Sequence, residues 1–248
     1  MRGLHMVMVI LLLSATASAQ RQEGPESTSP HFTLRYETGY TDEEVELVKT
    51  ELESAYRQLS EKYGFELQSK VPVYLTGSEV SYSRKVISRE RWGAVYSGGT
   101  LYFEPMTFIR KNGGLTITVR HALCHVVLQP MVVKGCPPWL VEALAVDFSG
   151  ELEILMKPSQ TSVKFFTDLN EALQEARTST ELEMTYYLLG LSMRYFEERF
   201  GARKISEMFK SFDGRSLDNQ VMERVFGVTY NDLQYQWSQY VDRRINAS

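Results

Sequence analysis

The sequence predicts an α+β protein in which a mixed α/β half is followed by a helical half. Up to about residue 135, short segments of alternating apolar residues are interleaved with a long amphipathic pattern. Beyond that point every apolar pattern has the helical period. We therefore expect an α/β half over 31–135 and a helical half over 136–248, a segregation typical of the α+β class.

The N-terminus has the pattern of a secretory signal. Arg2 precedes an apolar run over 6–13, and the small residues 17–19 form an A-x-A cleavage site. The run is shorter than the ~20 residues that span a bilayer, so we expect cleavage after Ala19 and a secreted or periplasmic protein. The polar residues 20–30 are predicted to be a disordered lead-in to a domain over 31–248.

Alternation in the first half predicts strands over 32–36, 71–75, 92–97 and 100–103. The last two flank Gly98-Gly99 and are predicted to form a hairpin. A long helix separates the first two: Thr41 and Glu44 form a capping box at its start, and Gly64 ends it.

The second half contains the apolar spacing and capping residues of several helices. We predict a helix from Pro137 to just before Gly150, and a last helix that Thr229 caps. Between them, helices are predicted over 181–200, 203–212 and 217–226. The formal net charge of −4 argues against a nucleic-acid surface, and no segment after the leader suggests a membrane span.

Two histidines lie four residues apart at the junction of the halves, on a predicted helix over 118–128 that stops near 129–130. His121 and His125 are roughly 40° apart around the helix axis, so both imidazoles can reach one point. This is the spacing of the zinc-binding helix of metallopeptidases, His-Glu-x-x-His. Ala122 stands where that motif has glutamate.

A zinc site of this kind needs a third protein ligand and an open fourth position. Glu142, on the next predicted helix, is the best candidate, because the intervening loop lets the chain turn back. The alternative is that His121 and His125 are core histidines that bind no metal. The same residues, with their neighbours, resemble the peptidase MA-like family of gluzincin-type zinc metallopeptidases. The matching positions are Gly98-Gly99, His121, His125, Val126, Pro137, Trp139, Leu140, Glu142 and Ala145, then Arg199-Phe200-Gly201, Phe226-Gly227 and Trp237.

The resemblance covers about 32–245 and implies a zincin-like fold with zinc held by His121, His125 and Glu142. The chain departs from the family where Ala122 replaces the general base, and also at Cys124 and Ala143. Loss of a general base typically costs about 10²- to 10⁴-fold in rate.

Our first hypothesis is an exported pseudoprotease that keeps zinc and binds a peptide or protein ligand. A weakly or unconventionally active zinc metallopeptidase and a metal-free structural domain remain as alternatives.

Further residues have a suggested role. Tyr186 aligns with a tyrosine of the family's long helix and could stabilise an oxyanion, or simply pack in the core. Asp147 is a candidate partner for a histidine, although it lies about 140° round the helix from Glu142. Glu104 is the nearest carboxylate that might replace the base. The strand over 100–103 resembles the edge strand that binds extended substrates in zincins, with packing inside the sheet as the equal alternative.

The two cysteines, Cys124 and Cys136, would enter an oxidising compartment with an exported chain. They are candidates for a disulfide that would join the two ligand-bearing elements. Metal binding or burial as free thiols are the alternatives.

Overall fold

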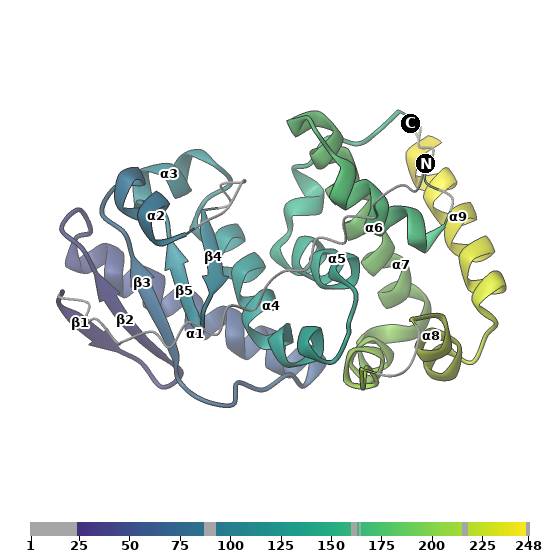
Figure 1. Ribbon diagram of the computed structural model, residues 1–248, viewed down its shortest axis with the longest axis horizontal. Coiled ribbons are helices and arrows are strands. Elements are labelled where there is room, and N and C mark those ends of the chain that lie inside the picture. Colours follow the sequence, from purple (N-terminus) through teal and green to yellow (C-terminus); the bar gives the residue numbers. More distant parts are fainter. Residues whose placement is uncertain (1–23, 87–92, 160–162, 164, 215–217, 247–248) are drawn as a thin grey trace, which may run out of the picture.

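The computed structural model describes residues 24–86, 93–159, 163, 165–214 and 218–246. A sheet with its helices forms one half, a bundle of helices forms the other, and α4 and α5 lie where the halves meet (Figure 1). The predicted α+β class is confirmed. Some predictions fall on residues outside the described ones. They are the leader over 1–19, the first residues of the disordered lead-in, and the first residue of the strand predicted over 92–97 and of the helix predicted over 217–226.

The sheet of the described residues has five strands in the order β1-β2-β3-β5-β4. The three central strands run parallel, and each edge strand is antiparallel to its neighbour. The strands are β1 Glu26–Thr28, β2 Phe32–Tyr36, β3 Val71–Leu75, β4 Ala94–Ser97 and β5 Thr100–Phe103.

Strand β1 corrects the prediction that residues 20–30 are disordered. It pairs with β2, with Glu26 opposite Arg35, and the two side chains form an ion pair at 2.9 Å. Lys49 donates a hydrogen bond to Ser27 at 3.1 Å. A polar segment with no apolar pattern of its own is thus ordered by pairing with a strand whose backbone is otherwise open on that side.

The Gly98-Gly99 hairpin forms as predicted, with positive φ angles of 56° and 83° that suit a type I′ turn. The prediction that 100–103 is the edge strand is wrong. Strand β5 lies between β3 and β4, so β4 is the edge. Both strands of a hairpin have similar local patterns, and only the parallel pairing of β5 with β3 decides which is interior.

The helices predicted above all form, with differences in their bounds. The capping box of Thr41 and Glu44 and the left-handed Gly64 delimit α1 as expected. Helix α6 was not predicted, and α7 joins two predicted helices across a kink at Gly201, where φ is 79°. The described helices are α1 Asp42–Tyr63, α2 Glu79–Lys85, α3 Met106–Lys111, α4 Leu115–Val133, α5 Pro138–Ser149, α6 Phe166–Glu175, α7 Ser179–Lys210, α8 Asp218–Phe226 and α9 Tyr230–Asn246, with a 3-10 turn η1 at Glu151–Glu153.

Helix α4 is the centre of the fold. It contacts α1 and β4 in the first half and α5 and α7 in the second. It extends past the predicted stop at Pro130 to Val133, since a proline in the last turn removes one backbone hydrogen bond without ending the helix. By length and composition α4 could cross a membrane, but half of its apolar window is buried inside the protein. We therefore describe it as a core helix.

The cysteine disulfide is not formed: Cys124 and Cys136 are both buried free thiols. The backbone N–H of Cys136 donates to the carbonyl of Met131 at 3.0 Å, which places Cys136 near the end of α4. Cys124 is seven residues before Met131, about 10 Å along the helix axis. A disulfide needs Cα atoms within about 7 Å, so the longer helix separates the pair.

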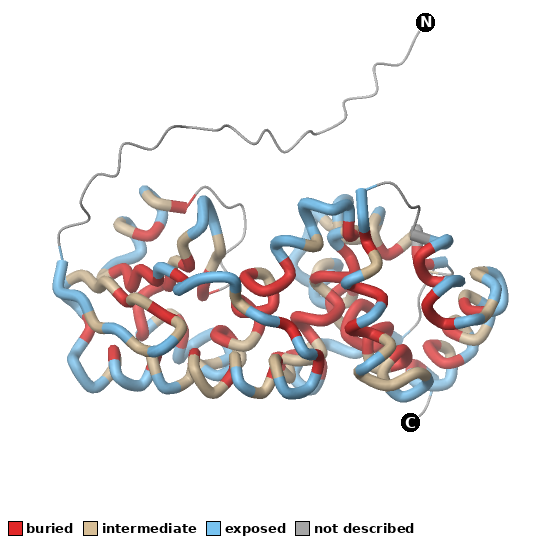
Figure 2. Tube along the Cα trace, turned by 90° about the horizontal axis from the view of Figure 1, so that it is seen from below, coloured by how far each residue is buried: buried red, intermediate tan, exposed pale blue. Residues whose placement is uncertain are grey.

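Buried segments concentrate where the helices face one another, and exposed residues lie on the outer turns (Figure 2). The closest approach of α5 and α7 is at Gly190, where an added Cβ would lie 2.6 Å from Val146 Cγ1 and 3.3 Å from Leu152 Cδ1. A side chain there would push α7 away from α5.

We predict that Gly190→Val lowers the free energy of unfolding by about 1–3 kcal/mol, because it overpacks a filled interface. Urea unfolding followed by circular dichroism measures this. Adding Val146→Ala to the same chain should recover part of the loss, since it removes the methyl group in conflict. A Gly190→Val protein as stable as the wild type would show that the helices are not in close contact here.

Candidate metal centre

Helices α4 and α5 bring the three predicted ligands together. The Nε2 atoms of His121 and His125 are 3.1 Å apart. Glu142 Oε2 is 3.5 Å from His121 Nε2, and Glu142 Oε1 is 3.6 Å from His125 Nε2. These residues form a group that could hold a metal ion. The prediction from residue spacing is confirmed to that extent.

The spacing of the donor atoms fits a tetrahedral ion. Nitrogen ligands of zinc at about 2.0–2.1 Å are about 3.3–3.4 Å apart in a tetrahedron, and the two histidine Nε2 atoms are 3.1 Å apart. Each nitrogen faces a different oxygen of Glu142, at 3.5 and 3.6 Å, so either oxygen can serve as the third ligand. In addition, Glu142 Oε2 is buried and has no hydrogen-bond partner among the described residues. A buried carboxylate oxygen is rarely left without a partner in a native structure, and an ion between the three side chains would supply one.

A fourth side chain, Glu151, contacts the other face of His121. Its Oε1 is 3.0 Å from His121 Nδ1, and the residue is 8% exposed. Helix α5 ends at Gly150 in the left-handed conformation (φ 88°), and the 3-10 turn η1 then returns Glu151 to the histidine. A carboxylate that accepts the Nδ1 proton directs the Nε2 lone pair of His121 into the site, as in many metal centres.

Glu151 is not among the residues that the sequence indicated, and Asp147 was the candidate for this role. Asp147 forms ion pairs with Arg194 at 3.0 and 3.1 Å, which is consistent with its position on a different face of α5. In the sequence, Glu151 directly follows Gly150, the glycine that ends the helix. A carboxylate after such a glycine is too common to identify a metal site by itself.

The charges of the site favour a cation at its centre. Burial opposes ionisation of Glu142, but the two histidines and a hydrogen bond from Tyr186 outweigh it and lower its pKa to about 2. Burial likewise opposes a charge on His121, yet Glu151 and Glu142 raise its pKa to about 10. Burial lowers the pKa of His125. The ionised Glu142 therefore faces the position between the two histidines, and Glu151 adds a second acidic side chain behind His121. A positive charge is stabilised there, which is the environment that a metal dication requires.

A cavity of about 210 Å³ opens on this group. Residues 94–96 of β4 form one wall, and Gln129 of α4 and Tyr186 of α7 complete it. Tyr186 is 4% exposed, and its ring centroid is 6.4 Å from that of His121. Tyr186 therefore lies beside the site, as the sequence analysis considered. Neither Gln129 nor the β4 residues were identified from sequence, because they reach the cavity only through the tertiary fold.

Two other predicted residues are not part of the cavity wall. Ala122 is 2% exposed and packs in the core under the site. Glu104 is fully buried, its N–H donates to Gly93, and its carbonyl accepts from Tyr40. Among the described residues that line the cavity, Glu142 is the sole carboxylate.

A comparison of the chain with models of protein families finds no match. A comparison with curated proteins finds no match either. The chemistry of the site is therefore inferred from the side chains that form it.

We predict that the purified protein binds one zinc ion per chain and that His125→Ala and Glu142→Gln each weaken binding at least 100-fold. Each variant removes one of three ligands and leaves the fold intact. Zinc competition with a chromogenic chelator measures the affinity. His31→Ala is the matched control, because His31 pairs with Glu53 at 2.7 Å on another surface. Equal affinity in all four proteins would show that zinc binds elsewhere.

Glu151→Gln should weaken zinc binding about 10- to 100-fold, the usual cost of losing a hydrogen-bonded partner of a metal ligand. The variant keeps the shape and removes the charge beside His121. Glu153→Gln serves as the control, since Glu153 belongs to the same turn but pairs with Arg194. If both variants have the wild-type affinity, Glu151 does not orient the ligand.

Proposed function

We propose that this protein is an exported, zincin-like homologue of the gluzincin metallopeptidases that holds zinc through His121, His125 and Glu142 and binds a peptide or protein without cleaving it efficiently. The observation that carries the proposal is the composition of the cavity wall. Among the described lining residues, the sole carboxylate is a ligand, and the position next to His121 that would bear a general base is Ala122.

When bound, zinc would act as a Lewis acid toward a peptide carbonyl. The side chains of this chain would hold and shape the site. Glu151 would fix the tautomer of His121, so that its Nε2 carries a lone pair. Tyr186 lies where its hydroxyl could donate to a developing oxyanion. The methyl group of Ala122 cannot accept a proton or deliver one to a leaving amine. Among the described residues that line the cavity, the sole carboxylate is the ligand Glu142, so the proton transfer that amide cleavage requires would be slow.

The edge strand β4 supports a peptide as the ligand. Its residues 94–96 line the cavity, and among the described strands it pairs with β5 alone. The second edge of β4 therefore offers backbone N–H and C=O groups to an extended chain, as in β-augmentation. A peptide that pairs with β4 would run past the metal centre.

Two alternatives retain some support. Tyr186 beside the ligands favours a weakly active zinc metallopeptidase, because an oxyanion donor remains without the base. The ion pair of His121 with Glu151 favours a metal-free structural domain, because a protonated His121 would balance the buried carboxylates. Zinc affinity separates this last case from the others. The proposed export rests on the leader sequence, and a membrane-impermeant label or fractionation of the producing cell would test it.

We predict that the zinc-loaded wild type cleaves a mixed peptide library at least about 100-fold more slowly than Ala122→Glu, since the substitution restores a general base. Mass spectrometry of the peptides measures cleavage. The control is the double variant Ala122→Glu, His125→Ala, which has the base but lacks a ligand. Because Ala122 is buried, circular dichroism must show that each variant is folded.

Strong, zinc-dependent cleavage by the wild type would contradict the proposal and favour the active metallopeptidase. A folded, zinc-loaded Ala122→Glu protein without activity would show that the remaining cavity no longer fits a substrate for cleavage.

A further inference from the structure

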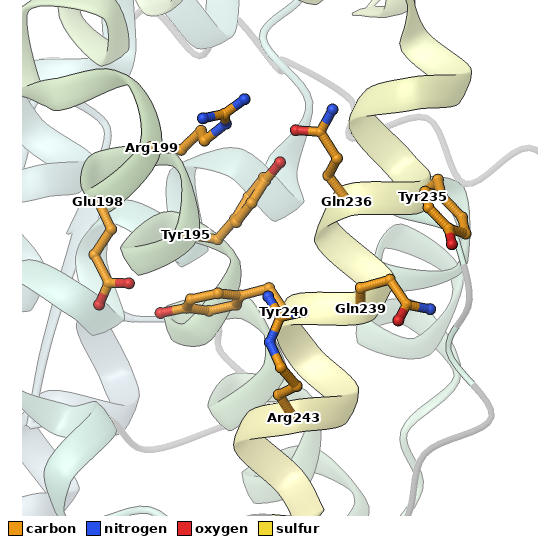
Figure 3. A pocket seen from close by; sticks show the side chains of 8 residues that line it. All are labelled: Tyr195, Glu198, Arg199, Tyr235, Gln236, Gln239, Tyr240 and Arg243. Carbon is orange, nitrogen blue, oxygen red and sulfur yellow. The ribbon is translucent and has the colours of Figure 1, made fainter.

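A second cavity lies between α7 and α9, in the helical half (Figure 3). Its volume is about 500 Å³, within the range of roughly 300–1,000 Å³ that small-molecule sites occupy. Tyr195 is on its wall, nine residues after Tyr186 along α7, which is about 14 Å of helix. The cavity is therefore separate from the metal centre.

The charged side chains of this cavity leave an excess of positive charge. Arg199 and Arg243 both line it, and neither forms an ion pair among the described residues. The carboxylate at the wall, Glu198, is bound to Arg244 at 3.0 and 3.2 Å and so does not neutralise either one. Figure 3 shows the two guanidinium groups, which come from different helices, on opposite sides of Tyr195. Each of them can bind a carboxylate or a phosphate through paired hydrogen bonds.

A buried hydroxyl points to a missing partner in the same place. Tyr195 is 4% exposed, and its hydroxyl has no hydrogen-bond partner among the described residues. Its ring projects from α7 into the gap, toward Gln236 on α9 (Figure 3). Buried hydroxyl groups in native proteins are nearly always hydrogen-bonded, so this donor, beside a cavity, is available to an acceptor on a bound ligand.

Aromatic rings form the rest of the inner wall. The ring centroids of Tyr195 and Tyr240 are 5.3 Å apart, with the planes tilted by 53°. The hydroxyl of Tyr240 is turned toward Glu198 (Figure 3). The two ring surfaces suit a planar apolar group, which would pack against them with the offset or edge-on geometry that aromatic rings prefer.

We propose that the cavity between α7 and α9 binds a small organic anion that carries a planar ring. One of the two guanidinium groups, of Arg199 or Arg243, would bind the anionic group, and the other would add to the positive charge of the cavity. The hydroxyl of Tyr195 would donate a hydrogen bond to the ligand. The ring would lie against Tyr195 and Tyr240. This site is independent of the metal centre, and removal of a zinc ligand leaves it unchanged.

The test is an NMR titration of the full chain with three probes: benzoate, phenyl phosphate and the uncharged benzamide. We expect benzoate or phenyl phosphate to bind at least about 10-fold more tightly than benzamide, because hydrogen bonds to a charged group are the stronger ones. The tighter of the two anions identifies the anionic group as carboxylate or phosphate. Equal binding of all three probes, or no binding of either anion at roughly 10 mM, overturns the proposal.

Variants locate the binding. Arg243→Gln and Arg199→Gln should both reduce the affinity for the better anion, and the variant that removes the contacting guanidinium should reduce it at least about 10-fold. Arg203→Gln is the matched control, since it removes the same charge from an exposed position of α7 outside the cavity. Two arginine variants are tested so that, if one does not fold, the other still shows whether an arginine of the cavity contributes to anion binding. An effect of Arg203→Gln as large as theirs would show a general charge effect and overturn the site.

Tyr195→Phe separates ligand contact from packing. It should lower the affinity for the anion several-fold, while the melting temperature of the ligand-free protein stays the same or rises, because the lost hydroxyl had no partner. His125→Ala should bind the anion like the wild type. Unchanged anion affinity in Tyr195→Phe would remove this hydroxyl from the proposed site.

Discussion

The metal centre depends on how the protein compensates the negative charges of two carboxylates that lie largely away from water. Glu142 and Glu151 lie on opposite sides of one imidazole, His121, in a region largely removed from water. Removing a carboxylate from water is expensive unless a positive charge and hydrogen bonds compensate for it. A protonated His121 can provide one charge, but it leaves Glu142 Oε2 without a hydrogen bond. A metal dication between the three ligands balances both carboxylates, and this is why we favour a metal centre over a structural ion pair.

The packing of three helices fixes this arrangement. Helix α4 provides both histidines, α5 provides Glu142 and ends so that η1 can present Glu151, and α7 closes the cavity with Tyr186. The absence of a side chain at Gly190 lets α7 lie directly on α5. On the other side, β4 lies against α4 and pairs, among the described strands, with β5 alone. The site is thus built from rigid elements, and the part that we propose for peptide binding is a strand edge.

The sequence was most informative where the chemistry is local. The histidine pair could be predicted because a four-residue spacing on a helix fixes the direction of both side chains, and Glu142 followed from the next helix. Glu151, Gln129 and the β4 wall could not be predicted, since no local pattern indicates which turns or strands meet at a site. The sequence left three states open for the cysteines, and the structure shows buried free thiols, because the helix continues through Pro130 and separates Cys124 from Cys136. Strand β1 was missed because its order comes from its neighbour β2 and not from its own residues.

The central claim is that zinc is held by two imidazoles and one carboxylate, and X-ray absorption spectroscopy of the zinc-loaded full chain tests it most directly. The account predicts a four-coordinate shell of nitrogen and oxygen atoms at about 2.0–2.1 Å, with the outer-shell scattering of two imidazole rings. A shell that contains sulfur at about 2.3 Å, or one with no imidazole scattering, would contradict it and place the metal at the cysteines or on surface carboxylates.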